Sequence, residues 1–134
     1  MDKATLVGPD IEMGYEFLQA LDRANVKVNV LIWAYLSEYE DWRLVVAARQ
    51  FDALGSRDAY RLLFDSLAAA GFTVRDAPTI TVLPMAHSFI KELRRIYGKA
   101  TNGKRVFRSG ISVRIFKQLI GDHWVEEAYA YRIS

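Results

Sequence analysis

The chain has 134 residues, of which 51% are hydrophobic and 25% are charged, and it carries a net charge of +2, three prolines and no cysteine. This length is typical of one domain with one hydrophobic core, and the composition excludes a disordered chain, a disulfide scaffold and a thiolate metal site. The longest apolar run, residues 30–36, is too short to span a bilayer, and the N-terminus lacks the pattern of a signal peptide, so we expect one cytoplasmic domain outside the membrane.

The first predicted helix begins at Gly8-Pro9-Asp10, because proline suits the first helical position and an acid there faces the positive end of the helix dipole. Apolar residues recur at spacings of three and four to about Ala24, and Asn25 suits a left-handed stop. A β-hairpin is predicted over residues 26–51, with an acidic turn between two alternating strands. The expected core face of its first strand carries Val26, Val28, Val30, Ile32 and Ala34.

A second helix is predicted to begin at Ser56 and to end at Gly71, followed by a short β-branched strand over residues 79–83. A third helix begins at His87 or Ser88 and ends at Gly98, and residues 99–104 are predicted to form a loop. The final hairpin pairs a strand that begins near residue 111 with one over residues 124–133. On that last strand one face is expected to carry Val125, Glu127, Tyr129, Tyr131 and Ile133.

The predicted element order is α-ββ-α-β-α-ββ. It is neither the strict alternation of a doubly wound fold nor an all-β pattern, so it predicts an α+β domain. We expect about five strands in a mixed, mostly antiparallel sheet, with three helices packed on one or both faces in two or three layers. The order of the strands does not follow from the sequence.

Two stretches of the chain resemble a group of short bacterial proteins that are usually described only as uncharacterised. They are YEDWRLVVAA at residues 39–48 and AYAYRI at residues 128–133. The resemblance covers most of the chain. It implies no activity and no catalytic residue, because none is attached to that group.

The charge of the chain is unevenly distributed. Residues 91–117 contain nine basic residues and one acid and so carry +8, which leaves −6 for the rest of the chain. The basic residues are Lys91, Arg94, Arg95, Lys99, Lys104, Arg105, Arg108, Arg114 and Lys117. This segment indicates a surface for nucleic-acid phosphates or another polyanion, and a solvated helix face and loop is the alternative interpretation.

Aromatic and arginine side chains gather around the first predicted hairpin. On an open sheet face such side chains stack single-stranded bases, whereas under a helix they form a second core layer, and in a dimer they form an interface. The candidate stacking residues are Trp33, Tyr35, Arg43 and Arg49.

Acidic residues crowd both hairpin turns. If the two turns met at one end of the sheet, their carboxylates and an imidazole could hold Mg²⁺ or Mn²⁺ and support phosphodiester hydrolysis. The candidate ligands are Glu40, Asp41, Asp122 and His123. The simpler interpretation is that these residues are solvated and protect strand edges, because their spacing matches no recognised metal motif.

No motif for nucleophilic catalysis or nucleotide binding occurs in the sequence. Gly-x-Ser-x-Gly is absent, residues 98–103 lack the Gly-Lys-Ser/Thr ending of a phosphate loop, and the two histidines, His87 and His123, are expected at a helix start and in a turn. No cofactor is predicted. The sequence therefore favours a small binding module that is not an enzyme and whose residues 91–117 engage nucleic acid or an acidic partner protein. The alternatives are a metal-dependent nuclease and a structural protein that forms homo-oligomers such as a homodimer.

Overall fold

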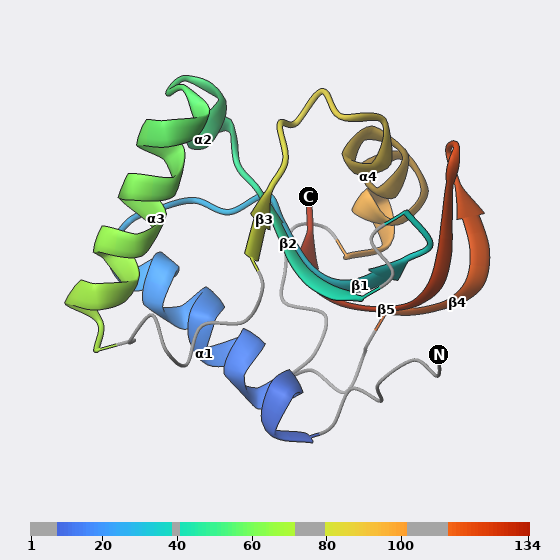
Figure 1. The fold of residues 1–134 in the computed structure, drawn as a ribbon, viewed down its shortest axis with the longest axis horizontal. Coiled ribbons are helices and arrows are strands. Elements are labelled where there is room, and N and C mark those ends of the chain that lie inside the picture. Colours follow the sequence, from blue (N-terminus) through green and yellow to red (C-terminus); the bar gives the residue numbers. More distant parts are fainter. Residues whose placement is uncertain (1–7, 39–40, 72–79, 102–112) are drawn as a thin grey trace.

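The structure is a computed structural model that describes residues 8–38, 41–71, 80–101 and 113–134 (Figure 1). In these ranges the elements are α1 (Gly8–Arg23), β1 (Val30–Leu36), β2 (Trp42–Ala47), α2 (Arg49–Asp52), α3 (Ser56–Ala69), β3 (Ile80–Val82), α4 (Ser88–Thr101), β4 (Val113–Ile120) and β5 (His123–Ile133). The predicted α+β class is confirmed, with one helix, α2, beyond the expected three. Within the described ranges no helix combines the length and the apolarity that a membrane crossing requires.

The five strands form one mixed sheet in the order β3-β2-β1-β5-β4. β2 and β3 pair in parallel, and the other pairs are antiparallel. β1 is therefore the central strand, and it joins the first hairpin to the last one. Figure 1 shows α4 on one side of the sheet and α1 on the other, with α3 packed beside α1.

Both faces of β1 are buried, and each belongs to a separate core. Leu31 and Trp33 pack in a core with α1 and α3, which we call the α1-side core. Val30 and Ile32 pack in a second core with α4, which we call the α4-side core. The predicted core face is thus confirmed for its strand residues, but the opposite face is also core because helices cover it. Val26 and Val28 precede β1 and lie in the α1-side core, so their predicted place beside Val30 was wrong.

Two element boundaries differ from the predictions, and two predicted helix stops are supported. The second strand of the hairpin ends at Ala47, and the residues from Arg49 begin the short helix α2. α4 continues through Gly98 to Thr101, because a glycine inside a helix costs only about 1 kcal/mol and need not end it. The predicted stops at Asn25 and Gly71 are supported by positive φ values of 60° and 90°. The rest of the predicted loop, residues 102–104, lies outside the described ranges.

The prediction that one face of β5 carries all five of its listed residues was wrong. The register between β1 and β5 shifts between Leu31 and Ile32 and again between Tyr35 and Leu36. Each such irregularity transfers the following side chains to the other face of the sheet. As a result Tyr129 and Tyr131 lie in the α1-side core, whereas the ends of the strand, Val125 and Ile133, lie in the α4-side core.

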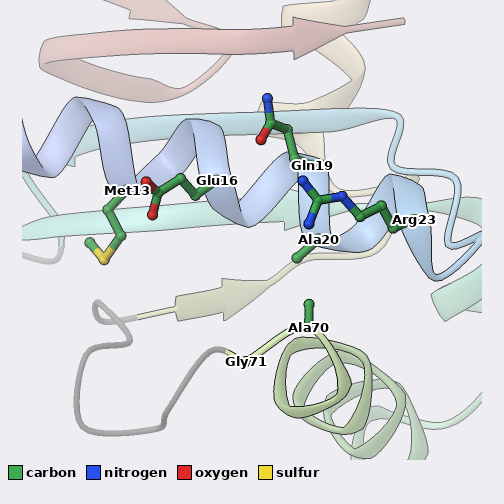
Figure 2. Close-up of a pocket in the computed structure, with 7 residues that line it drawn as sticks. All are labelled: Met13, Glu16, Gln19, Ala20, Arg23, Ala70 and Gly71. Atoms are coloured by element: carbon green, nitrogen blue, oxygen red, sulfur yellow. The ribbon is translucent and has the colours of Figure 1, made fainter.

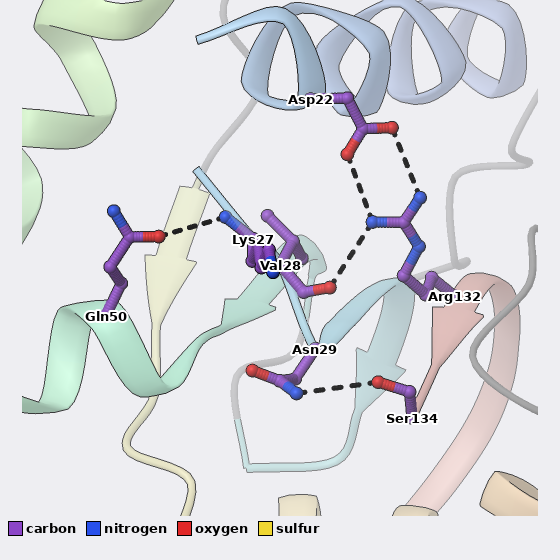
Figure 3. Close-up of polar contacts among 7 residues, drawn as sticks. All are labelled: Asp22, Lys27, Val28, Asn29, Gln50, Arg132 and Ser134. Atoms are coloured by element: carbon purple, nitrogen blue, oxygen red, sulfur yellow. Dashed lines mark hydrogen bonds and ion pairs between the residues drawn. The ribbon is translucent and has the colours of Figure 1, made fainter. Parts of the chain in front are cut away.

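The connection between α1 and β1 is held by polar contacts (Figure 3). The guanidinium of Arg132 donates to both carboxylate oxygens of Asp22, at 3.1 and 3.2 Å, and to the carbonyl oxygen of Val28 at 3.4 Å. Nearby, the Asn29 side chain donates to the Ser134 hydroxyl, and its oxygen accepts from the Arg49 backbone N–H at 3.1 Å. These bonds join α1, α2 and the end of β5 around a segment that has no regular structure of its own.

Candidate functional site

The described part of the basic segment is divided between α4 and β4. On α4, the Nε atom of Arg94 donates to the carbonyl oxygen of Ser134 at 2.8 Å, and Arg95 pairs with Glu92 at 2.6 Å. The hydrogen bond from Arg95 lowers the pKa of Glu92 and raises the pKa of Arg95 itself. Both guanidinium groups thus make hydrogen bonds within the protein. Arg95 and Lys91 are exposed on this helix, whereas Arg94 is half-buried. The predicted contacts Lys104, Arg105 and Arg108 lie outside the described residues, as does the side chain of Lys99.

The β4–β5 hairpin carries three exposed hydrophobic side chains. Phe116 is 56% exposed, Leu119 is 59% exposed and Trp124 is 39% exposed. Leu119 lies directly opposite Trp124 in the pairing of the two strands. The indole N–H of Trp124 donates to Glu126 at 2.9 Å, which holds the ring in place. Exposed aromatic side chains on neighbouring strands are unusual unless they meet a ligand or another surface.

These side chains share the sheet face that points away from α4. Ile115 and Ile120 lie in the α4-side core, and adjacent residues of a strand point to opposite faces, so Phe116 and Leu119 point away from α4. Lys117, between them, has a φ of 44°, and it stands opposite the irregular part of β5. This local break of the alternation places both hydrophobic residues on one face. We call Arg114, Phe116, Lys117, Leu119 and Trp124 the hairpin face.

Cationic groups accompany the aromatic rings of the hairpin face. The guanidinium carbon of Arg114 lies 5.2 Å from the centre of the Tyr129 ring, which is itself buried. Lys117 is exposed at the break in β4. Figure 1 shows this hairpin at the end of the molecule opposite α3. The structure thus joins part of the predicted basic segment to an exposed apolar surface.

The candidate stacking residues around the first hairpin do not form an open face. Trp33 is only 4% exposed and packs in the α1-side core, which supports the alternative of a second core layer. Tyr35 is half-buried and meets Trp42 edge to face, with ring centres 5.8 Å apart. Arg43 is half-buried against Asp41 and Thr81. Arg49 is exposed but lies in α2, and this unpredicted helix separates it from the strand.

The two hairpin turns meet at one end of the sheet, where α4 begins. Nδ1 of His123 lies 2.6 Å from a carboxylate oxygen of Glu38, and Nε2 lies 2.7 Å from the hydroxyl oxygen of Ser88. The rings of His87 and Phe89 pack against the imidazole of His123, with centres 5.3 and 5.8 Å away. We call Glu38, Ser88 and His123 the turn cluster.

The predicted metal ligands do not converge in the described structure. Asp41 pairs with Arg43 at 3.0 Å, Asp122 is exposed on the second turn, and Glu40 lies outside the described residues. The described ranges contain no group of three or more histidine, aspartate or glutamate side chains that could hold a metal ion. The two turns therefore meet through Glu38 and His123. The other ring nitrogen of His123 faces the Ser88 hydroxyl and not a second carboxylate.

An open groove of about 560 Å³ lies between α1 and the end of α3 (Figure 2). It is lined by Met13, Glu16, Gln19, Ala20, Arg23, Ala70 and Gly71. Its charged groups, Glu16 and Arg23, stand two turns apart on the same helix and do not converge on one point (Figure 2). We assign no function to this groove.

No sequence pattern indicated Ser88, Glu38 or Trp124 as a functional residue. Ser88 was visible as a helix start, and Glu38 as one of several acids in a turn, but their partner His123 is 35 and 85 residues away, respectively. No local motif links residues at such separations. Comparison of the chain with protein-family models, with curated proteins and with solved structures finds no significant match.

Proposed function

We propose that this protein is a cytoplasmic binding module for single-stranded nucleic acid and that the hairpin face is its binding surface. The observation that carries the proposal is the exposure of Phe116 and Trp124 on the same sheet face as the guanidinium of Arg114, with Lys117 beside them. Proteins that bind single strands combine these two elements, a cationic track for phosphates and aromatic rings for bases. The proposal retains the expectation of a nucleic-acid partner for the basic segment.

The aromatic part of the hairpin face favours single strands over duplexes. A base can stack on a protein ring only when its own faces are free, and in a duplex its neighbours cover them. Each stacked base contributes roughly 1–3 kcal/mol, so two rings give a useful affinity even before phosphate contacts are added. An acidic protein partner would use the cations but has no comparable need for exposed aromatic rings.

The test is fluorescence anisotropy with short labelled oligonucleotides, single-stranded and duplex, at low salt. We expect saturable binding that is stronger for single strands. Removing both rings, by Phe116→Ala with Trp124→Ala, should weaken it at least about tenfold, because two stacking contacts are lost. With two phosphate contacts, from Arg114 and Lys117, the slope of log affinity against log salt should be about −1.4, so affinity should fall about sevenfold from roughly 50 to 200 mM salt.

The matched control reverses the same number of charges elsewhere. Arg57 and Arg61 are exposed on α3, far from the hairpin face in Figure 1. Arg57→Glu with Arg61→Glu changes the net charge as much as Arg114→Glu with Lys117→Glu, and only the second pair should weaken binding. Equal effects of the two pairs would show that net charge alone attracts the oligonucleotide.

Other outcomes decide between the remaining functions. Absence of binding at low salt to every oligonucleotide would contradict the proposal. If the protein bound polyglutamate with the same affinity as the oligonucleotides, an acidic protein partner would be favoured instead. The hairpin face would also suit a second copy of the chain. Analytical ultracentrifugation would then show a dimer that Leu119→Asp and Trp124→Asp dissociate, and the proposal would give way to the homodimer.

A further inference from the structure

The turn cluster brings together a hydroxyl, an imidazole and a carboxylate from three distant parts of the chain. Ser88 is the first residue of α4, His123 is the first residue of β5, and Glu38 follows the end of β1. The imidazole lies between the other two side chains, with 2.6 Å from Nδ1 to the carboxylate and 2.7 Å from Nε2 to the hydroxyl. In this order the carboxylate orients the ring and the ring can accept the hydroxyl proton.

The protonation pattern follows from the partners of each ring. The ionised carboxylate of Glu38 can only accept, so Nδ1 of His123 must carry the proton of that bond. In the neutral ring Nε2 then has a lone pair, and the Ser88 hydroxyl donates to it. His87 does not compete for this proton through Nδ1, because Nδ1 of His87 accepts the backbone N–H of Phe89 at 3.2 Å. Burial and the neighbouring His123 also lower the pKa of His87, which favours its neutral form.

Ser88 is not required as the cap of α4. The carbonyl oxygen of His87 accepts the first helical bond, from the Lys91 N–H at 2.9 Å, and the ring of His87 accepts the Phe89 N–H. His87 is therefore the N-cap residue in both backbone and side chain. A serine at a helix start usually bonds to the helix backbone, but the hydroxyl of Ser88 lies against His123 instead.

The cluster is accessible, and its surroundings suit a developing negative charge. Ser88 is exposed, whereas the His123 side chain is only 14% exposed beneath the rings of His87 and Phe89. The backbone N–H of Ser88 is in the first turn of α4 and has no acceptor within the helix. The dipole of this 14-residue helix adds to its attraction for an oxyanion.

We propose that Ser88 is a nucleophile that hydrolyses unhindered carboxylic esters. Its oxygen attacks the ester carbonyl while His123 takes the hydroxyl proton, and the tetrahedral intermediate collapses to an acyl-Ser88 ester as the alcohol leaves with that proton. Water then attacks the acyl group, His123 takes one proton of the water and returns it to the Ser88 oxygen, and the carboxylic acid is released. Glu38 stabilises the imidazolium in both halves and is a positioning residue. The site lies on the open surface, so it suits short acyl groups. The proposal does not depend on nucleic-acid binding.

The experiment compares two serines within the same intact protein. Ser56 is also exposed and is also the first residue of a helix, α3, but it is paired with neither of the two histidines, both of which lie in the described ranges. A fluorophosphonate probe followed by peptide mass spectrometry should label Ser88 at least about 100-fold faster than Ser56, since a positioned general base contributes about this factor. The comparison is made in the wild-type chain, so it does not require any variant to fold.

Variants then assign the roles. Ser88→Ala should remove labelling and the hydrolysis of p-nitrophenyl acetate, and His123→Ala should slow both by about 100-fold. Glu38→Gln should slow them less and should lower kcat for p-nitrophenyl acetate without raising KM, because it leaves the imidazole in place and removes only the charge that stabilises the imidazolium formed during the reaction. Labelling of Ser88 and Ser56 at equal rates would overturn the proposal. So would hydrolysis that survives in folded His123→Ala, and the cluster would then be only a structural link between the turns and α4.

Discussion

The centre and one edge of the sheet use apolar residues in opposite ways. In β1, at the centre, every residue from Val30 to Ala34 is at most 4% exposed, because α4 covers one face and α1 covers the other. In the β4–β5 hairpin, at the edge, one face packs under α4, while Phe116, Leu119 and Trp124 on the other face remain exposed. An apolar side chain therefore contributes to folding in the first region and is available to a ligand in the second.

The largest expected effect is that of a charged substitution in the central strand. Val30→Asp buries an unpaired carboxylate in the α4-side core, where Val30 is completely buried, and should cost about 4 kcal/mol or more of unfolding free energy. Little soluble protein should be recovered. Lys27→Asp, three residues earlier and exposed, is the matched control and should express normally. Equal yields of the two variants would contradict the assignment of β1 as the central strand.

A smaller effect is expected where α1 packs on β5 at the border of the two regions. A Cβ atom at Gly14 would overlap the ring and the hydroxyl of Tyr131, which is 1% exposed and donates to the carbonyl oxygen of Ile11 at 2.6 Å. Gly14→Ala should therefore destabilise the protein by about 1–3 kcal/mol through overpacking, although alanine favours a helix. The measurement is urea unfolding.

Gly55 is the control for this prediction. A Cβ atom there would meet nothing within 4 Å, and its φ of −70° suits any residue. Gly55 is the N-cap of α3, where glycine is preferred over alanine, so Gly55→Ala should cost less than about 1 kcal/mol of unfolding free energy. A Gly14→Ala variant as stable as Gly55→Ala would show that α1 does not pack closely on Tyr131.

The smallest effect on stability is expected on the hairpin face. Leu119 is 59% exposed, so Leu119→Asp removes little buried apolar surface and should change the unfolding free energy by about 0.5 kcal/mol or less. The same substitution should weaken oligonucleotide binding, since it places a negative charge beside Trp124 where phosphates are expected. A loss of several kcal/mol, measured by urea unfolding, would mean that this face belongs to the core.

Part of the fold could be predicted because local rules decide it. The stop of α1 at Asn25 and the glycine after α3, Gly71, follow from which residues tolerate positive φ, and the structure contains both. The strand at residues 30–36 follows from its unbroken apolar composition. The same composition does not show whether one or both faces of the strand are covered, so it does not exclude Trp33 as a stacking residue. In the structure α1 covers this face, and Trp33 lies in the α1-side core.

The element order and the α+β class thus follow from periodicity and helix-terminal residues, which depend only on neighbours along the chain. Three features instead depend on packing between distant segments: the strand order, the shifts in β5 that send Val125 and Tyr129 to opposite cores, and the meeting of Glu38, Ser88 and His123. A one-residue shift exchanges the faces of a strand without changing its apolar pattern, and a hydrogen bond across 85 residues leaves no local spacing to detect. Both candidate sites arise in this way, because the hairpin face requires the break at Lys117 and the turn cluster requires β1 and β5 to lie side by side.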